Sequence, residues 1–286
     1  MNGAGGAGGS EGGAPPIVNG FPESWPDGTD CASEDPMFVW AYAPDTFILR
    51  QSLCTSFEGP FVHLLFGEDR ALLLDTGDGG IPIRDTVRAV IDEWLAGHGK
   101  SSIELVVVHS HAHGDHTQGD SQFSGEPDTT VVGTNLAAVT EFFGMDPWPD
   151  QVAQLDLGGR VLDVIPIPGH EATHIALYDR RHELLFTGDT LYPGRLYVQN
   201  FATYVTSLDR LTAFVEAGNP VSWVLGCHIE MTTTPGEDFE FGADVHPNEH
   251  ALELTEDHLF ELQQAAQAMA GAPQYEAHDD FIIYPL

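Results

Sequence analysis

The chain has 286 residues, of which 42% are hydrophobic, so it can form one large domain or two small ones around a substantial core. Its formal net charge is −34, with 44 acidic residues against one lysine and nine arginines. Such an acidic surface repels phosphate backbones, which argues against nucleic-acid processing, and it suits solubility or tolerance of high salt.

The N-terminus is expected to be a flexible tail. Residues 1–16 are mostly glycine and alanine, without the basic and apolar regions of a signal peptide. We therefore predict a tail over residues 1–20 and a single domain over residues 21–286. No apolar run reaches the roughly 18 residues that a transmembrane helix needs. Localisation stays open between the cytoplasm and export with a signal already removed.

Beyond the tail, apolar and alternating segments predict a layered α/β fold. The first helix is expected to have Pro82 near its first turn. Helices are expected at 82–97, 134–143, 202–217 and 248–270. Strands are expected at 37–43, 46–53, 60–66, 70–75, 103–108, 129–132, 161–167, 173–178, 183–187, 221–226 and 279–284.

The segment His111-Ala112-His113-Gly114-Asp115-His116 directly follows the apolar run 103–108. Three imidazoles and a carboxylate within six residues suit zinc or another borderline divalent metal. In an extended segment the side chains of His111 and His113 point the same way, whereas Asp115 and His116 diverge from them. One loop can therefore supply ligands to two adjacent metal ions.

Three later residues extend this motif into a site. His170 follows a predicted strand and a Pro-Gly turn, Asp189 lies just beyond the strand at 183–187, and His228 ends the apolar run Val224-Leu225-Gly226-Cys227. Each lies where a strand gives way to a loop, which is where rigid scaffolds usually hold reactive groups. Together with the motif they give seven donors, enough for a two-metal site.

In these ordered motifs the chain resembles the metallo-β-lactamase superfamily over roughly residues 37 to 230. The family's early aspartate matches Asp75 in Leu74-Asp75-Thr76-Gly77. The resemblance implies a four-layer αββα sandwich, and the related segments 72–78 and 184–190 fit its two similar halves. It assigns metal ligands as follows: His111, His113 and His170 to the first metal, Asp115, His116 and His228 to the second, and Asp189 to both.

The same resemblance narrows the activity. An aspartate at the position of Asp189 is typical of glyoxalase II-like thioesterases, lactonases and phosphodiesterases, and argues against β-lactam hydrolysis. The stretch Gly226-Cys227-His228-Ile229-Glu230 departs from the Cys-Gly-His-Glu-Tyr of glyoxalase II itself.

We expect a dinuclear zinc hydrolase in which a metal-bridging hydroxide attacks a carboxylic ester, lactone or thioester of a small molecule. Iron or manganese could replace zinc, and the oligomeric state is left open. Asp115 is expected to help orient the nucleophile. Asp75 is expected to support the ligand-bearing segment 111–116, which we call the metal loop. The alternatives are a phosphodiesterase of the same fold, a mononuclear iron oxygenase resembling persulfide dioxygenases, and an inactive scaffold with a structural metal.

Residues that contact substrate are less well defined. Tyr192 either donates a hydrogen bond to the developing oxyanion, as similarly placed tyrosines do in lactonase-like relatives, or packs under its loop. Arg195 either binds a substrate anion or, as we favour, forms a structural ion pair. The apolar residues Phe142, Phe143, Met145 and Trp148 form a pocket wall or part of the core.

Three cysteines and two further histidines receive structural interpretations. We interpret Cys31 and Cys54 as buried thiols, although in an exported protein they would bridge the N-terminal segment to the first strands. Cys227 is expected to be a small core residue. His109 is expected beside the metal ligands and His174 in a structural role.

Overall fold

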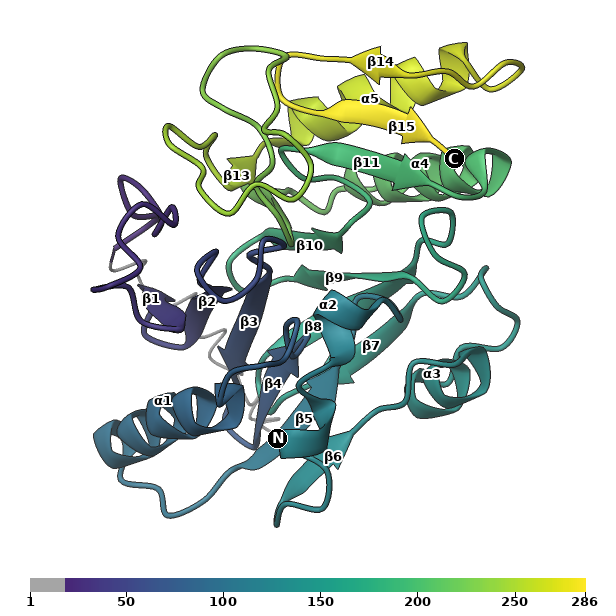
Figure 1. Ribbon diagram of the computed structural model, residues 1–286. Coiled ribbons are helices and arrows are strands. Elements are labelled where there is room, and N and C mark those ends of the chain that lie inside the picture. Colours follow the sequence, from purple (N-terminus) through teal and green to yellow (C-terminus); the bar gives the residue numbers. More distant parts are fainter. Residues whose placement is uncertain (1–18) are drawn as a thin grey trace, which may run out of the picture.

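The structure, a computed structural model, describes residues 19–286 as two six-stranded sheets that pack face to face, with helices on their outer faces (Figure 1). The predicted N-terminal tail lies almost entirely outside the described residues. The central strands are apolar and buried almost without interruption, and successive side chains point to opposite faces, so each sheet has two apolar faces to cover. The second sheet covers one face and the outer helices cover the other.

The first sheet is built in sequence order, β1 to β6. Its first four strands form an antiparallel meander, whereas β5 and β6 run parallel to β4. Helix α1 (Ile83–His98) makes the crossover from β4 to β5. The strands are β1 (Met37–Ala43), β2 (Thr46–Gln51), β3 (Phe61–Phe66), β4 (Arg70–Leu74), β5 (Glu104–Val108) and β6 (Thr129–Val131).

The second sheet has the order β13-β12-β10-β9-β8-β7. Strand β10 pairs antiparallel with β9 and parallel with β12, and helix α4 (Phe201–Glu216) makes the crossover. Its strands are β7 (Ala153–Asp156), β8 (Val161–Pro166), β9 (Ile175–Asp179), β10 (Leu184–Gly188), β12 (Trp223–Gly226) and β13 (Glu253–Leu254).

The remaining elements lie at the ends of the sandwich. Helix α5 (Glu256–Ala268) packs beside α4, next to a three-stranded sheet (Figure 1). That small sheet has the order β11-β15-β14, and its strands are β11 (Arg195–Val198), β14 (Glu276–Ala277) and β15 (Ile282–Pro285). Two short helices follow β5 and β6: α2 (Gly114–Thr117) and α3 (Leu136–Phe143).

Three apolar clusters separate the four layers. Along β4, Leu72 and Leu74 point between the two sheets, whereas Ala71 and Leu73 point toward α1. On the second sheet, the outward residues pack against α4 and α5. Because successive side chains of a strand point to opposite faces, each buried strand serves two clusters. The predicted four-layer αββα fold is confirmed.

Some predicted boundaries were wrong. The last helix begins at Glu256, not at 248, because Thr255 and His258 form a capping box there, and the preceding residues include β13. The helix predicted from Thr134 begins at Leu136, with Asn135 as its N-cap. Strands β7, β11, β13 and β14 were not predicted, and each has only two to four residues.

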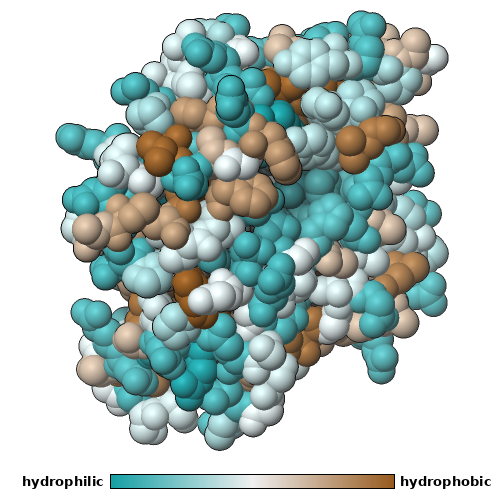
Figure 2. Space-filling view, viewed as in Figure 1, coloured by the Kyte–Doolittle hydropathy of each residue, from teal (hydrophilic) through white to brown (hydrophobic). Residues whose placement is uncertain are grey.

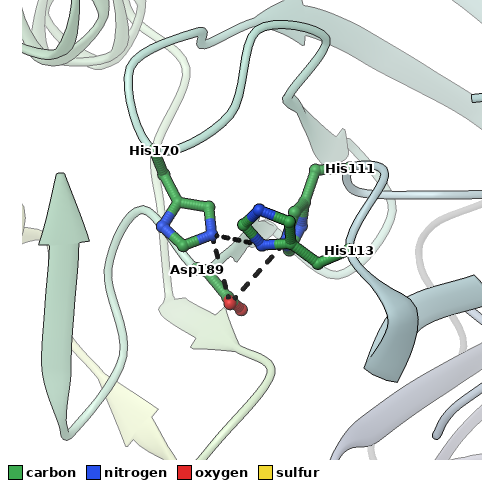
Figure 3. Close-up of side chains that lie close together, drawn as sticks. All are labelled: His111, His113, His170 and Asp189. Carbon is green, nitrogen blue, oxygen red and sulfur yellow. Dashed lines mark hydrogen bonds and ion pairs between the residues drawn. The ribbon is translucent and has the colours of Figure 1, made fainter. Parts of the chain in front are cut away.

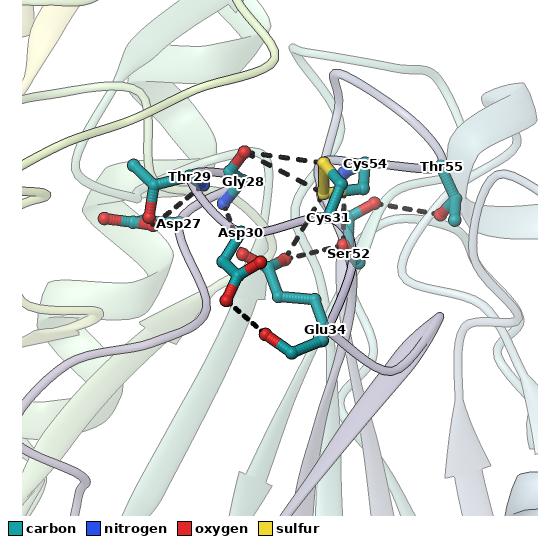
Figure 4. The surroundings of a disulfide bond; sticks show 10 residues. Asp27, Gly28, Thr29, Asp30, Cys31, Glu34, Ser52, Cys54 and Thr55 are labelled. Carbon is teal, nitrogen blue, oxygen red and sulfur yellow. Dashed lines mark hydrogen bonds between the residues drawn. A yellow bond between two sulfur atoms is a disulfide. The ribbon is translucent and has the colours of Figure 1, made fainter.

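The interpretation of Cys31 and Cys54 as free thiols was also wrong. The two residues form a disulfide that closes a separation of 23 residues (Figure 4). Glu34 reinforces the link, because its carboxylate accepts hydrogen bonds from the Gly28 amide and the Ser52 hydroxyl. The bond therefore fastens the N-terminal segment to the loop between β2 and β3. Cys227 is a buried core residue, as expected.

The visible face of the molecule is mainly hydrophilic, with small and separate hydrophobic patches (Figure 2). This agrees with the acidic composition. Among residues 19–286, no helix is long and apolar enough to cross a membrane.

Candidate metal centre

The seven predicted metal ligands meet at one edge of the sandwich. His111 and His113 follow β5 in the first sheet, whereas His170, Asp189 and His228 follow β8, β10 and β12 in the second. The ends of strands from both sheets face each other there, so residues far apart in sequence become neighbours (Figure 1).

A first cluster joins three imidazoles and a carboxylate (Figure 3). Nδ1 of His113 lies 2.9 Å from Nε2 of His111 and 3.0 Å from Nε2 of His170. Oδ2 of Asp189 lies 3.7 Å from the first of these Nε2 atoms and 3.5 Å from the second. Four donor atoms thus converge within a space that one ion fills.

A second cluster shares Asp189 with the first. Oδ2 of Asp115 lies 3.1 Å from Nε2 of His116 and 3.2 Å from Nε2 of His228. The other oxygen of Asp189, Oδ1, lies 3.5 Å from each of these nitrogens. One carboxylate therefore faces both clusters, with a different oxygen toward each.

Contacts behind the ligands orient three of the rings. Nδ1 of His170 lies 2.6 Å from the Tyr197 carbonyl oxygen, and Nδ1 of His228 lies 2.9 Å from the Glu58 carbonyl oxygen. A carbonyl only accepts, so each Nδ1 carries the proton and each Nε2 presents a lone pair to the cluster. Nδ1 of His116 lies 2.9 Å from a carboxylate oxygen of Asp75, which has the same effect.

Asp75 also supports the metal loop directly. Its carboxylate accepts hydrogen bonds from the backbone amide and the hydroxyl of Ser110. The Sγ of Cys227 lies 3.5 Å from the same carboxylate. Burial and the nearby Asp75 raise the pKa of the Cys227 thiol.

The donor set fits divalent metal ions. Nε2 of His116 and Oδ1 of Asp189 are buried without a hydrogen-bond partner among the described residues. Burial alone would lower the pKa of His116, but the carboxylates of Asp189, Asp75 and Asp115 raise this pKa well above its usual value. The cluster thus attracts positive charge, and its mixture of nitrogen and carboxylate ligands suits zinc or a similar cation.

The two clusters open into a cavity of about 230 Å³. Sequence reasoning missed several of its lining residues because they lie on loops or at the chain end, without a motif. The missed residues are Glu58, Gln199, Phe241 and Leu286. Burial, together with the carboxylates of Asp115 and Glu230, raises the pKa of Glu58 to about 6.

Tyr192 lines this cavity, but its hydroxyl is engaged elsewhere. The hydroxyl donates to the Arg195 carbonyl oxygen and lies 3.2 Å from a carboxylate oxygen of Glu230, and the ring packs edge-on against His228. A phenol has one proton to give. The contacts therefore favour a packing role for Tyr192 over the oxyanion role.

The other sequence interpretations divide between structural contacts and packing. Arg195 forms ion pairs with Glu230 and Asp238, as favoured. His109 contacts Asp120, and His174 is buried with its ring stacked on His111. Met145 belongs to the core, whereas Trp148 lines a neighbouring cavity.

Comparisons with known proteins agree with this architecture. The model of the metallo-beta-lactamase superfamily matches residues 56–228. The acyl-coenzyme A thioesterase MBLAC2 of Gallus gallus is 31% identical over 202 residues, covering 59% of this chain and 72% of that protein. The hydroxyacylglutathione hydrolase of Aeromonas hydrophila subsp. hydrophila is 30% identical over 202 residues, covering 69% of this chain and 70% of that protein. The mono-zinc crystal structure of the metallo-beta-lactamase FIM-1 from Pseudomonas aeruginosa aligns with a TM-score of 0.53 at 18% identity, covering 84% of this chain and 98% of that chain.

Proposed function

Because this chain belongs to the metallo-beta-lactamase superfamily, we propose that it is a dinuclear zinc hydrolase that cleaves a carboxylic ester, lactone or thioester. The observation that carries the proposal is the position of Asp189, whose two oxygens face different clusters. A single structural ion needs only one closed set of four ligands, and here two sets share one residue.

The proposed ligand sets follow the two clusters. The first metal would be held by His111, His113 and His170, the second by Asp115, His116 and His228, and both by Asp189. When bound, such a pair of cations lowers the pKa of water and polarises a carbonyl oxygen. Iron and manganese accept the same donors, so the identity of the metal belongs to the test.

The chain's own residues would position the reaction. Asp115 both belongs to the second cluster and lines the cavity, so we propose that its carboxylate orients the attacking water by accepting a hydrogen bond. Asp75 would hold His116 through its Nδ1. Two relatives whose names denote thioester hydrolysis support a carboxyl substrate over a phosphodiester.

Hydrolysis of a paired panel tests this proposal. Carboxylic esters, lactones and thioesters are compared with phosphodiesters, on zinc-loaded and chelator-stripped protein, with bound metal counted by elemental analysis. We expect turnover confined to the carboxyl substrates and loss of turnover with the metal. Turnover of phosphodiesters alone, or oxygen uptake by an iron-loaded protein that hydrolyses nothing, would contradict the proposal.

Single substitutions give a second test. His116→Ala and Asp189→Ala are expected to lower kcat by at least about 100-fold, because each removes a ligand, while the circular dichroism spectrum is retained. His98→Ala is the matched control, since His98 lies at the end of α1, away from both clusters. Full activity of either ligand variant would refute the two-metal site.

A further inference from the structure

A second cavity adjoins the candidate metal centre. It has a volume of about 340 Å³ and shares His170 and Gln199 with the first cavity. Its walls include Trp148, Pro149 and Pro168. A substrate whose carbonyl lies at the metal ligands can therefore extend into either cavity on the two sides of its scissile bond.

None of the ten lysine and arginine residues of the chain lines either cavity, and the histidines that do are proposed metal ligands. Arg195 contacts two residues that line the first cavity, Glu230 and Tyr192. Its guanidinium already donates hydrogen bonds to Glu230, Asp238 and the Phe239 carbonyl. A substrate phosphate or carboxylate would thus find no partner of the kind that usually binds it.

The cavity walls are instead acidic. Glu58 and Glu230 line the first cavity, and Glu171 lines the second. Among residues 19–286, the Glu58 carboxylate has no hydrogen bond or ion pair, since only the backbone of this residue forms hydrogen bonds. Bound cations would offset Asp115 and Asp189, which are proposed ligands, and Arg195 already pairs with Glu230. Glu58 is therefore the side-chain carboxylate of the first cavity that has neither kind of partner.

Aromatic side chains complete the walls. Phe241 lines the first cavity, is 72% exposed, and packs edge-on against Phe57, which is 40% exposed. Trp148 has the corresponding place in the second cavity. Exposed aromatic surface of this kind stabilises uncharged or cationic groups and gives nothing to an anion.

We propose that this site selects substrates without an anionic group, and that Glu58 is one residue that sets this selection. The inference rests on the proposed function and names its substrate class, which is uncharged esters or thioesters. Conjugates of coenzyme A or glutathione, which carry phosphates or carboxylates, would be disfavoured. The chain would thus differ in substrate from the relatives whose names denote such conjugates.

A matched series of butyryl thioesters tests the proposal. The three thiols have the same ethylene spacer and end in a sulfonate, a methyl sulfone or a trimethylammonium group, so they differ in charge and little in size. In each reaction water adds to the carbonyl carbon and the carbon–sulfur bond breaks, which gives butyrate and the free thiol. We expect kcat/KM for the sulfone to exceed that for the sulfonate by about tenfold or more, and the ammonium thioester to do at least as well as the sulfone.

Two variants locate the source of the selectivity. Glu58→Gln is expected to reduce the sulfone-to-sulfonate ratio by about threefold, because it removes one nearby charge. Glu141→Gln, on the exposed side of α3, removes the same charge from a residue that lines neither cavity and should leave the ratio unchanged. Binding of the corresponding butyl thioethers to zinc-loaded protein, measured by calorimetry, should show the same order, and no turnover occurs because a thioether has no carbonyl to attack.

The outcomes separate this inference from the proposed function. Equal turnover of the sulfonate and the sulfone would overturn the inference and leave the hydrolase proposal standing. The same holds if Glu58→Gln and Glu141→Gln change the sulfone-to-sulfonate ratio by the same factor. If the protein hydrolyses none of the three thioesters and none of the esters and lactones of the earlier panel, the proposed function is refuted and the inference falls with it.

Discussion

Asp75 shows how one residue prepares the candidate metal centre without facing the cavity. Its backbone adopts φ 69°, a left-handed conformation that costs a non-glycine residue free energy. The carboxylate offsets that cost by accepting hydrogen bonds from the Ser110 amide and hydroxyl and by contacting His116. These contacts set both the path of the metal loop and the tautomer of one proposed ligand.

Replacement of this carboxylate by an amide should weaken metal binding. In Asp75→Asn the amide nitrogen cannot accept the proton of His116 Nδ1, so the ring would lose its orienting partner or change tautomer. We expect metal affinity to fall by about 10- to 100-fold, measured by competition with a chromophoric chelator. Asp78→Asn is the control, because Asp78 contacts Ser56 and Gln118 but no proposed ligand. Unchanged affinity in Asp75→Asn would show that the contact does not act on the metal.

Tyr192 allows a test between its two sequence interpretations. Because its hydroxyl donates to the Arg195 carbonyl inside the protein, Tyr192→Phe should lower kcat by less than about threefold and the free energy of unfolding by about 1 kcal/mol. Steady-state kinetics and urea denaturation measure the two effects. A loss of kcat of about 100-fold at unchanged stability and metal content would instead establish the oxyanion role.

At the scale of elements, the two halves repeat one arrangement. In the first half β3 and β4 are antiparallel, α1 crosses over, and β5 returns parallel to β4; β9, β10, α4 and β12 do the same in the second. Asp75 and Asp189 follow corresponding strands, as do His111 and His228. The related segments 72–78 and 184–190 therefore predicted a real correspondence between the halves.

This repetition explains how much the sequence could predict. Long buried strands have strong apolar patterns, so a layered α/β fold and seven donors at strand ends followed from them. The αββα sandwich and the grouping of the donors on two metals came from the family resemblance. Short edge strands such as β13 and β14 lack a pattern, because their pairing depends on tertiary contacts. Glu58 and Phe241 lie on loops, and only folding brings them to the cavity.

The Cys31–Cys54 disulfide is the element-scale contact that the sequence interpretation did not predict. It closes a separation of 23 residues, and a loop of that size corresponds to about 3 kcal/mol of stabilisation in the chain-entropy model. The double variant Cys31→Ser/Cys54→Ser should lose roughly this amount in chemical denaturation. Treatment of the parent protein with a reductant should give a similar loss, and should not change the double variant. A double variant as stable as the parent would show that the bond constrains nothing.

At the scale of the whole molecule, a buried ionic network joins the two sheets at the end of the sandwich opposite the metal centre. Arg160, which is 1% exposed, donates to both oxygens of Asp179, to the Thr46 hydroxyl and to the carbonyls of Asp45 and Phe66. These partners lie at the ends of β3 and β9, in the turn between β1 and β2, and at the start of β2. Because such charges are stable in a core only when every group has partners, the network favours one relative placement of the sheets.

Asp45 gives this network a pH dependence that stability measurements can detect. Burial alone would raise its pKa, but hydrogen bonds from His182 and Arg181 and the charge of Arg160 hold the pKa of Asp45 well below its usual value. Since the folded-state pKa is lower than the unfolded value of about 3.9, the stabilisation is complete above that pH and is lost as the pH falls toward the folded-state pKa.

Asp45→Asn should therefore lower the free energy of unfolding by about 2 kcal/mol near neutral pH, and the difference should narrow below about pH 4. Asp85→Asn, which removes an exposed partner of Arg84, should cost about 0.5 kcal/mol or less at any pH. Urea denaturation of the three proteins between about pH 7 and pH 3 measures both differences. A deficit in Asp45→Asn that stays constant over this range would mean that the Asp45 side chain stabilises the fold through its shape and not through its charge.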